Sequence, residues 1–294
     1  MSAKDWKATY NGENSGDLRK LQLAELDMMK MFSEICDRNG LRYYMVGGTM
    51  LGAVRHKGFV PWDDDMDVGM PRPDYERFIE IARENLPEGY AFLNYKLDPS
   101  YHRYFSRIIN KNVAVHNASN TKVIVENAWL DIFPFDGMPS RKWQQKIHFW
   151  HVTFLRFLYH ASCFDELVNL NRPGRPRYLQ AVIRFLSITH FGSGFDTIKL
   201  MRKVEKELLR YSYDDCRYMV SMFGSYMEKE IVNKKLLGKG RPYQFEDTTF
   251  NGPVKGDAFL RHFYGDYMQP PKDADKDKHN ILKIEFDGKP EDKE

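Results

Sequence analysis

The sequence predicts an α+β fold in which helices pack on a mixed β-sheet. From residue 18 to residue 136, segments with the apolar spacing of helices alternate with strand-like segments, which is typical of a sheet covered by helices. A largely helical section rich in aromatic residues follows, from residue 141 to about residue 211. The length of 294 residues suits one large domain, or one domain with a helical appendage.

The first predicted elements lead to a pair of glycines. We expect residues 1–17 to form a flexible tail, because this stretch is polar. Apolar residues at helical spacing predict a helix over residues 18–38, and residues 41–46 are predicted to form a strand. Gly47-Gly48 then turns the chain into a short helix from Thr49 to about Arg55.

The rest of the predicted sheet lies between residues 65 and 133. The expected elements are, in order, a strand over residues 65–70, a helix over residues 74–85 that follows Pro71-Arg72-Pro73, strands within residues 105–109 and 114–116, and a strand within residues 123–133. The last strand carries a single acid, Asp131, among apolar residues. Residues 18–140 are therefore expected to form one core.

The second half of the chain is divided by its composition. Residues 141–244 are predicted to be mainly helical, and the sequence Arg-Pro-Gly-Arg-Pro-Arg at residues 172–177 is predicted to be a basic break between two helices. Residues 245–294 are expected to form a loop-rich extension that packs on the core. Beyond Lys272 the chain is charged, and we expect its end to be frayed.

Composition excludes several classes of protein. Hydrophobic residues make up 42% and charged residues 29%, and the net charge is only +3, so neither disorder nor a nucleic-acid partner is indicated. The three cysteines, Cys36, Cys163 and Cys216, are too few and too far apart for a disulfide framework or a zinc site. We find neither a secretory signal nor a run near the roughly 18 apolar residues of a membrane span, and therefore expect a soluble, cytoplasmic protein.

Four aspartates crowd into five residues, at Asp63, Asp64, Asp65 and Asp67. Like charges this close are unfavourable unless a cation neutralises them. Asp65 and Asp67 point to the same face of the predicted strand, and the apolar residues between them point to the other. Two carboxylates on a rigid strand suit a hard divalent cation such as Mg²⁺. The alternative is a solvated acidic turn, which the interleaved apolar residues disfavour.

Two further features point toward the same chemistry. Gly47-Gly48 at a helix N-terminus offers free N–H groups and a positive dipole end, which suit a phosphate, although a glycine pair alone is more often a turn. Asp131 lies among apolar residues and so needs a metal, a basic partner or a proton, although an acid at a strand end is commonly structural. Together with Asp65 and Asp67, these residues indicate metal-assisted phosphoryl or nucleotidyl transfer.

The stretch GGTMLGAVRHKGFVPWDDDMDVGMPRPDYERF resembles the LicD family of phosphocholine transferases, relatives of the fukutin group with a nucleotidyltransferase-like fold. Residues 129–136 and 263–268, followed by Pro270-Pro271 and His279, are similar to later stretches of the family. The resemblance implies that residues 18–140 are the catalytic core. It also implies that Gly47 and Gly48 form the phosphate turn, and that Asp65, Asp67 and Asp131 are catalytic residues and metal ligands.

The resemblance implies a metal-dependent transferase that uses Mg²⁺ or Mn²⁺. Such an enzyme moves phosphocholine or a similar phospho-alcohol from a CDP-activated donor such as CDP-choline to a hydroxyl of a cell-surface glycan, and releases CMP. Lipopolysaccharide, teichoic acid and capsule are glycans of this kind, and the acceptor can be lipid-linked. One alternative is a nucleotidyltransferase that moves NMP from an NTP. A second is a non-catalytic glycan- or nucleotide-binding protein, against which the intact acidic set argues.

Several neighbouring residues are candidates for substrate binding. Thr49 belongs to the glycine turn, and Arg55, His56 and Lys57 follow the short helix, from which they could reach diphosphate oxygens. The alternative for these three cations is a solvated helix end, where positive charge is favoured in any case. A choline head group would need an aromatic cage, for which the sequence singles out no particular ring.

Residues 141–184 interleave basic residues with aromatic and aliphatic ones. This composition suits an amphipathic helix on the inner surface of an anionic membrane, close to a lipid-linked acceptor. The alternative is that the aromatic residues pack on the catalytic sheet and the cations face solvent. Because aromatic stripes at helical spacing are usually core, the sequence favours packing.

Overall fold

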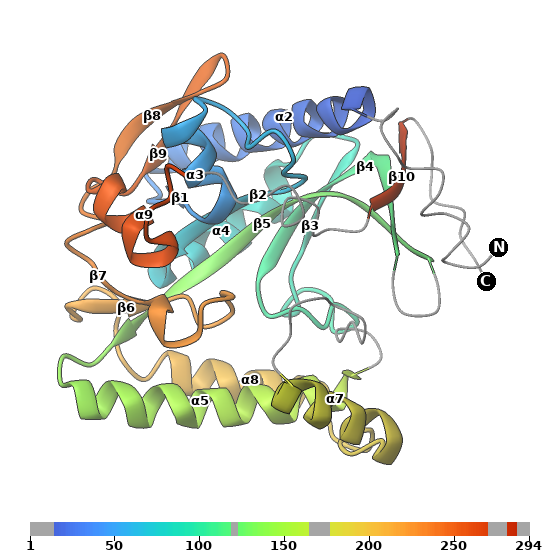
Figure 1. The fold of residues 1–294 in the computed structure, drawn as a ribbon, viewed down its shortest axis with the longest axis vertical. Coiled ribbons are helices and arrows are strands. Elements are labelled where there is room, and N and C mark those ends of the chain that lie inside the picture. The colour runs from blue at the N-terminus through green and yellow to red at the C-terminus, as the bar shows by residue number, and fades with distance from the viewer. Residues whose placement is uncertain (1–14, 119–122, 165–176, 270–280, 287–294) are drawn as a thin grey trace.

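The computed structural model describes residues 15–118, 123–164, 177–269 and 281–286. Its centre is a mixed sheet of eight strands, which confirms the predicted α+β class (Figure 1). The strands of this sheet are β1 (Tyr44–Met45), β2 (Met66–Pro71), β3 (Tyr90–Leu93), β4 (Ser106–Ala118), β5 (Val123–Met138), β6 (Tyr218–Val220), β7 (Ile231–Asn233) and β10 (Ile281–Phe286). The main order is β1-β2-β5-β4-β10; β3 also pairs with β4, and β6 joins β5 to β7. Strands β2 and β5 are parallel, and the other pairs are antiparallel.

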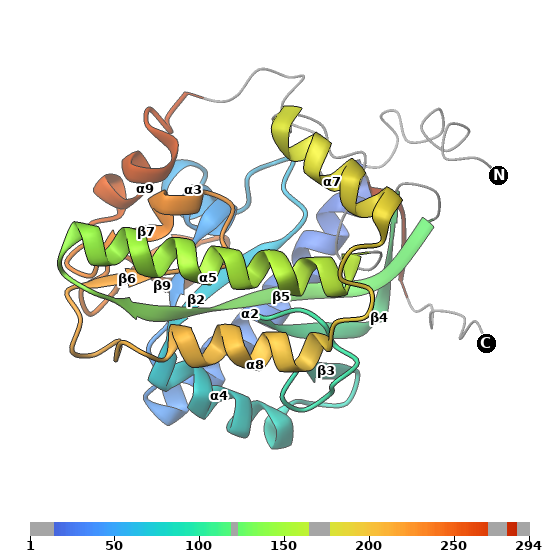
Figure 2. The same ribbon diagram turned by 90° about the horizontal axis from the view of Figure 1, so that it is seen from below.

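Helices cover the sheet and form a second layer beside it. The helices are α2 (Ser15–Asn39), α3 (Gly47–Arg55), α4 (Arg72–Asn85), α5 (Lys142–Ser162), α7 (Arg177–Thr189), α8 (Thr197–Leu208), α9 (Gly256–Tyr264) and the short 3₁₀ helix η1 (Met227–Glu230). A separate hairpin consists of β8 (Arg241–Phe245) and β9 (Thr248–Gly252). Helices α2 and α4 share the main core with the sheet, whereas α5 and α8 share a second hydrophobic cluster with β6. Figure 2 shows α5 and α8 side by side in front of β5.

Helix α2 packs on the sheet through a continuous apolar stripe. Leu21, Met28 and Phe32 on this stripe are fully buried, because their spacing places them on one side of the helix. The helix ends at Asn39, and Gly40 follows with a φ of +62°, a left-handed conformation that favours glycine after a helix. Glu25 lies on the same buried side and is the one acid among these apolar residues.

Several predicted boundaries shift in the structure. Helix α3 begins at Gly47 rather than at Thr49, and α4 begins at Arg72 rather than at Asp74. Proline in the first turn of α4 explains the second shift, since the missing N–H has no partner within a helix at that position. Strand β4 is continuous where two short strands were predicted, and β5 runs on to Met138.

The prediction was less accurate toward the C-terminus. The predicted helical region, residues 141–244, holds helices only as far as Leu208 apart from η1, and then contributes β6, β7 and part of β8. The expected loop-rich stretch from residue 245 contains β9 and α9, and the charged end contains β10, which pairs with β4. Strands β6 and β7 have three residues each, too few to show an alternating pattern.

Some expectations fall outside the described residues. They concern residues 1–14 of the predicted tail, most of the basic break at residues 172–177, Pro270-Pro271 and His279 of the family resemblance, and the final residues 287–294.

The aromatic residues of α5 divide between two faces. Phe149 and Tyr159 are buried in the cluster shared with α8, as the packing prediction requires. Trp150 and Phe154 are exposed by 54% and 58%, and for these the packing prediction is wrong. A helix packed on one side cannot bury residues on its far side, and the far side of α5 also carries large apolar residues.

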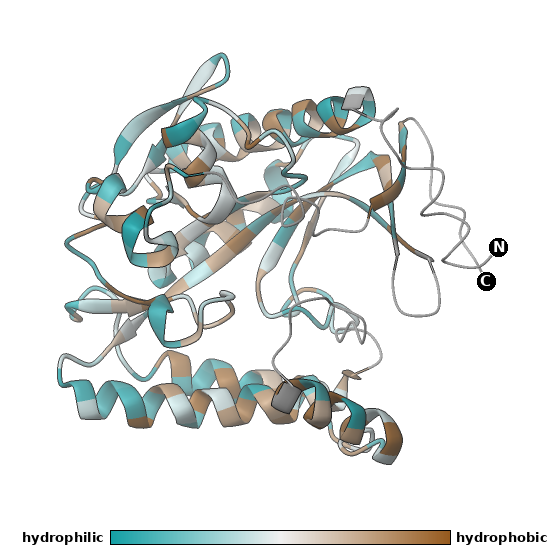
Figure 3. Cartoon of the chain, in the orientation of Figure 1, coloured by the Kyte–Doolittle hydropathy of each residue, from teal (hydrophilic) through white to brown (hydrophobic). Residues whose placement is uncertain are grey.

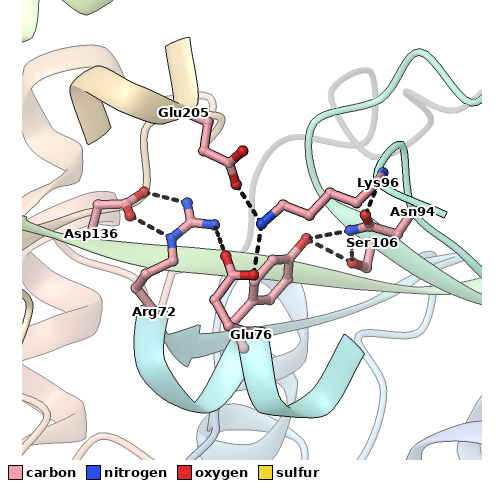
Figure 4. A network of polar contacts seen from close by, with 8 residues as sticks. Arg72, Glu76, Asn94, Lys96, Ser106, Asp136 and Glu205 are labelled. Atoms are coloured by element: carbon pink, nitrogen blue, oxygen red, sulfur yellow. Dashed lines mark hydrogen bonds and ion pairs between the residues drawn. The ribbon is translucent and has the colours of Figure 1, made fainter. Parts of the chain in front are cut away.

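A buried polar network ties α4 to the second layer (Figure 4). Arg72 forms two hydrogen bonds to Asp136 of β5, at 2.6 and 2.8 Å, and a third to Glu76 at 3.1 Å. Lys96 lies between Glu76 and Glu205 of α8, at 2.6 and 2.5 Å. Of these pairs Arg72–Asp136 is fully buried, and breaking it would leave an uncompensated charge, which costs about 3–5 kcal/mol. Asp136, the last acid of the family-like stretch 129–136, thus has a structural partner.

Candidate active site

The glycine pair begins α3 and lies against the acidic segment. Gly47 has a φ of +54°, which favours glycine. A β-carbon on Gly47 would lie 2.6 Å from Asp67 Oδ2, and one on Gly48 would lie 2.0 Å from Asp63 Oδ2. Both distances are far below van der Waals contact, so only glycine lets the two carboxylates approach the start of the helix this closely.

The backbone of Asp67 fixes β2 against the same helix. Its N–H donates to Thr49 Oγ1 at 2.7 Å, and its carbonyl accepts the N–H of Val46 at 3.2 Å. Thr49 is buried, and its hydroxyl therefore positions the acidic strand. A direct contact between Thr49 and a substrate stays a prediction.

Asp131 lies beside Asp67 and is held by an arginine. The two aspartates are in register across the parallel strands β2 and β5. Arg107 of β4 donates from Nε to Asp131 Oδ1 at 2.6 Å, and its guanidinium lies 4.5 Å from the centre of the Trp129 ring. Of the three partners that the sequence allowed for Asp131, the structure thus supplies the basic one. Its role as a third metal ligand stays a prediction.

Three acids gather immediately before β2. One carboxylate oxygen each of Asp63, Asp64 and Asp65 lies within 4.8 Å of the others. Asp65 was singled out from the sequence, whereas Asp63 and Asp64 were not assigned as ligands. The run of acids was a sufficient signal for both, but strand alternation directed attention to Asp65 and Asp67.

Glu25 of α2 faces the same acids. Its side chain is 0% exposed, and neither carboxylate oxygen has a hydrogen-bond partner among the described residues. Gln22, one turn earlier, donates to the Asp63 carbonyl at 2.9 Å, which places this face of α2 against the acidic segment. Burial raises the pKa of Glu25 well above its usual range, and Asp65 and Asp64 raise it further. Glu25 was not predicted as a site residue from the sequence, although an acid within the apolar stripe of α2 was a visible signal.

The acids that act on one another here form an acidic set, made up of Glu25, Asp63, Asp64, Asp65, Asp67 and Asp131. Burial raises the pKa of Asp67 well above its usual range, and the charges of Asp65 and Asp131 raise it further, although Arg107 acts in the opposite direction. Neutralising this set by protonation or by a cation would relieve the repulsion.

These features fit a hard divalent cation. All the donors are oxygen atoms, as Mg²⁺ and Mn²⁺ prefer. Glu25 is a buried carboxylate without a hydrogen-bond partner among the described residues, and Gly47 and Gly48 leave room that a β-carbon would fill. Asp65 and Asp67 would be the ligands expected from the sequence, with Asp63 beside Gly48.

A cavity of about 130 Å³ opens beside Asp67. Seven of its 15 lining residues are aromatic. These are Phe133 and Phe135 of β5, Phe223 and Tyr226 from the segment after β6, and Phe259, Phe263 and Tyr264 of α9. Sequence reasoning did not identify this wall, because its parts are up to 131 positions apart, from Phe133 to Tyr264, and only the fold brings them together.

One buried carboxylate stands in the aromatic wall. Glu230 at the end of η1 lines the cavity and accepts the backbone N–H of Tyr226 at 3.1 Å. A β-carbon on Gly224 would lie 2.0 Å from its Oε1, so the glycine makes room for this side chain. Burial raises the pKa of Glu230 to about 7, while Arg156 acts in the opposite direction. The cavity thus combines aromatic faces with two carboxylates, Asp67 on one side and Glu230 in the aromatic wall.

The predicted basic residues lie at the other end of α3. Arg55 is eight residues from Gly47, or about 12 Å along the helix axis. Its guanidinium donates to the Tyr267 carbonyl at 2.9 Å and lies 5.9 Å from the Trp62 ring centre. Neither Arg55, His56 nor Lys57 lines the cavity. Their contact with a diphosphate stays a prediction.

Comparison with known proteins gives a consistent result. Residues 40–166 match the family described as LicD/FKTN/FKRP, nucleotidyltransferase domain. The chain is 30% identical over 284 residues to the lipopolysaccharide cholinephosphotransferase LicD of Haemophilus influenzae. The aligned region covers 90% of this chain and 96% of that protein. Uncharacterized protein RT0683 of Rickettsia typhi is 36% identical over 78 residues, 26% of this chain and 25% of that one. The human ribitol 5-phosphate transferase FKRP is 44% identical over 36 residues, 12% of this chain and 7% of that protein.

Proposed function

The chain belongs to the LicD family and is a phosphotransferase, and we propose that it transfers phosphocholine from CDP-choline to a hydroxyl of a cell-surface glycan, with release of CMP. The observation that carries the proposal is that Asp67 belongs to two sites at once. Its carboxylate lies against the glycine turn among the acids, and it also lines the aromatic cavity. A diphosphate held at the first site would place its alcohol at the second.

The donor diphosphate would lie at the start of α3. The N–H groups of the first turn have no partner within the helix, and the dipole there is positive. Gly47 and Gly48 carry no side chain that would block a phosphate. Asp65 and Asp67 would hold Mg²⁺ or Mn²⁺, with Asp63 and Asp131 as further carboxylates. A bound metal of this kind would neutralise charge on the diphosphate and on the departing CMP.

The chain's own residues would set the geometry of transfer. Thr49 holds β2 to α3, so the carboxylate of Asp67 and the glycine turn keep a fixed relation. Arg107 holds Asp131 in place and limits the net negative charge of the set. The attacking hydroxyl would approach the phosphorus that bears the alcohol, opposite the oxygen that leaves with CMP.

The cavity favours choline over a polyol as the alcohol. Its volume of about 130 Å³ is close to the roughly 150 Å³ of an engineered cavity that binds benzene, so it suits a small head group. An aromatic face attracts a quaternary ammonium group by about 0.5–1 kcal/mol at an exposed site and by about 2 kcal/mol where the cation is desolvated. Glu230 adds a negative charge. Ribitol would instead bury several hydroxyls against rings that offer few hydrogen-bond partners.

A donor panel tests the proposal. The protein is incubated with Mg²⁺, a glycan acceptor and CDP-choline, CDP-ribitol or CDP-glycerol, and CMP release is followed. We expect the fastest release with CDP-choline and none with the Asp67→Asn variant. A parallel series with NTPs is assayed for pyrophosphate. Pyrophosphate release would establish nucleotidyl transfer instead, and Mg²⁺-independent binding without turnover of any donor would establish a binding protein.

A further inference from the structure

The outer side of α5 is an uncovered apolar stripe. Its five residues are Trp143, Ile147, Trp150, Phe154 and Phe157, and they recur at intervals of four and three along one side of the helix. The inner side is packed against α8, so the stripe is not needed for the core. Ile147 alone is 64% exposed, and it is the contiguity of the stripe that is unusual, since monomeric proteins rarely expose large continuous apolar patches.

Helix α7 and the turn after it continue the same surface. They expose Leu179, Val182, Phe185, Ile188, Phe191 and Phe195. The rings of Phe157 and Phe191 stack at 6.4 Å, which joins the two parts. Figure 3 shows hydrophobic bands on both helices at the lower edge of the molecule. Of 19 exposed large hydrophobic residues in the described chain, 11 lie here, and we call this surface the apolar face.

The charged residues of α5 and α7, the two helices of the apolar face, have one sign. Helices α5 and α7 contain no Asp or Glu. Arg141, Lys142, Lys146 and Arg184 are exposed on or beside these helices. The carboxylates of Glu207 and Glu228 approach α5 only from neighbouring elements, at His151 and Trp150. Among the described residues, the two helices therefore offer cations and aromatic residues together. At the edge of the face, Asp196 next to Phe195 pairs with Lys199 at 3.2 Å.

This combination decides which partner fits. A second copy of the chain docked face to face would bring cations against cations, with no carboxylate on either helix to pair with them. A membrane surface with anionic lipids provides phosphates for the cations and an apolar boundary for the rings. No helix among the described residues is long and apolar enough to cross a membrane. We infer that the apolar face docks this protein peripherally on an anionic membrane surface.

The apolar face adjoins the wall of the cavity. The Trp150 indole N–H donates to Glu228 Oε1 at 3.0 Å. Glu228 lies in η1, and Glu230 at the end of the same short helix lines the cavity. Docking through α5 would hold the cavity close to the plane of the membrane. The acceptor would then be a glycan attached to a membrane lipid, a conclusion that rests on the proposed glycan phosphotransferase activity.

Vesicle binding tests the inference with the whole chain. The protein is sedimented with vesicles of phosphatidylcholine alone or mixed with phosphatidylglycerol, at low and at high salt. We expect binding to the anionic vesicles only, weakening as salt screens the cations. Each of Lys142→Gln and Lys146→Gln should weaken binding by roughly fivefold. Ile147→Ser and Phe154→Ser should also weaken it, whereas Leu23→Ser, at an exposed apolar position on α2, should not.

A second measurement reports how deeply the tryptophans of α5 enter the lipid. Brominated lipids quench tryptophan that enters the acyl boundary, and we expect quenching that is reduced in Trp143→Phe. Absent binding at low salt, or equal binding to neutral and anionic vesicles, would overturn the inference. So would a stable dimer in sedimentation equilibrium that Phe154→Ser dissociates, since a second copy would then cover the face. CMP release with a water-soluble acceptor reports the proposed activity separately, and Phe154→Ser should retain it.

Discussion

Gly47 and Asp67 approach each other so closely that no β-carbon fits between them, since it would lie 2.6 Å from Asp67 Oδ2. Gly47→Ala would also strain the left-handed backbone by about 1–3 kcal/mol. We expect loss of CMP release and a lower melting temperature. Gly194→Ala is the matched control, because its β-carbon would meet open space. Unchanged activity of Gly47→Ala would show that the carboxylate can move without consequence.

Asp65→Asn and Asp67→Asn should abolish turnover while the protein stays folded. Because the fold raises the pKa of Asp67, stability falls as pH rises above the usual carboxylate range, and Asn removes this loss. The metal-free Asp67→Asn variant should therefore melt higher than the wild type, by a margin that grows with pH. Calorimetric melts and CMP release measure both effects, with the exposed Asp27→Asn as control. Near-normal turnover in either variant would refute the site assignment.

Asp131→Asn should destabilise the protein, because Arg107, which donates to Asp131 Oδ1 at 2.6 Å, would lose the negative charge that balances its own. Removing one partner of a buried pair costs about 3–5 kcal/mol, and we expect the lower end because Glu126 also contacts Arg107, at 3.1 Å. Denaturant unfolding gives the free energy, and calorimetric titration with Mn²⁺ gives the affinity. A loss of stability with unchanged Mn²⁺ affinity would assign Asp131 to structure alone.

Glu25→Gln should raise the melting temperature of the metal-free protein. Because the fold raises the pKa of Glu25, keeping this group buried costs free energy above the usual carboxylate range, as a repelled charge or as a bound proton. Gln removes this cost and keeps the shape of the side chain. The stabilisation that Mn²⁺ adds should be smaller than in the wild type, because one negative charge facing the cation is lost. Glu84→Gln, at an exposed position on α4, should change neither quantity. Equal Mn²⁺ stabilisation in Glu25→Gln and wild type would exclude Glu25 from the metal environment.

Choline affinity should rise with pH between 6 and 8. Glu230 has a pKa of about 7, so it is mainly neutral below this range and charged above it, and only the charged form attracts a quaternary ammonium. Titration calorimetry measures the affinity, and the same experiment on Glu230→Gln separates this effect from that of Asp67, which also lines the cavity. Glu230→Gln should bind choline weakly at every pH. If the choline affinity of the wild type did not change with pH, Glu230 would not act on the head group.

The sequence was sufficient to predict those parts of the site whose pattern lies within one short segment. The alternation around Asp65 and Asp67 predicted β2, and the glycine pair predicted the start of a helix beside it. Glu25 was missed because a single acid hardly alters the apolar period of a 25-residue helix. The partner of Asp131 was also beyond reach, since the position of Arg107 depends on the register of β4 against β5.

The aromatic cavity and the apolar face could not be predicted from the sequence, for two different reasons. The cavity is built from β5, η1, α9 and the segment after β6, so its wall exists only after long-range packing. On α5 the pattern was visible, but a helix that is apolar on both sides does not reveal which side is covered. Helix α8 covers one side, and that contact had no signature in the sequence of α5.

Strand β10 determines how the sheet ends. Strand β3 covers β4 at residues 107–110, and β10 covers it at residues 113–117. An unpaired strand edge offers its N–H and C=O groups to the same strand of another molecule. Truncation before Ile281 would uncover the outer half of β4 and invite edge-to-edge aggregation. Expression tags and domain boundaries should therefore preserve residues 281–286, although they lie far from Asp65, Asp67 and Asp131 in sequence.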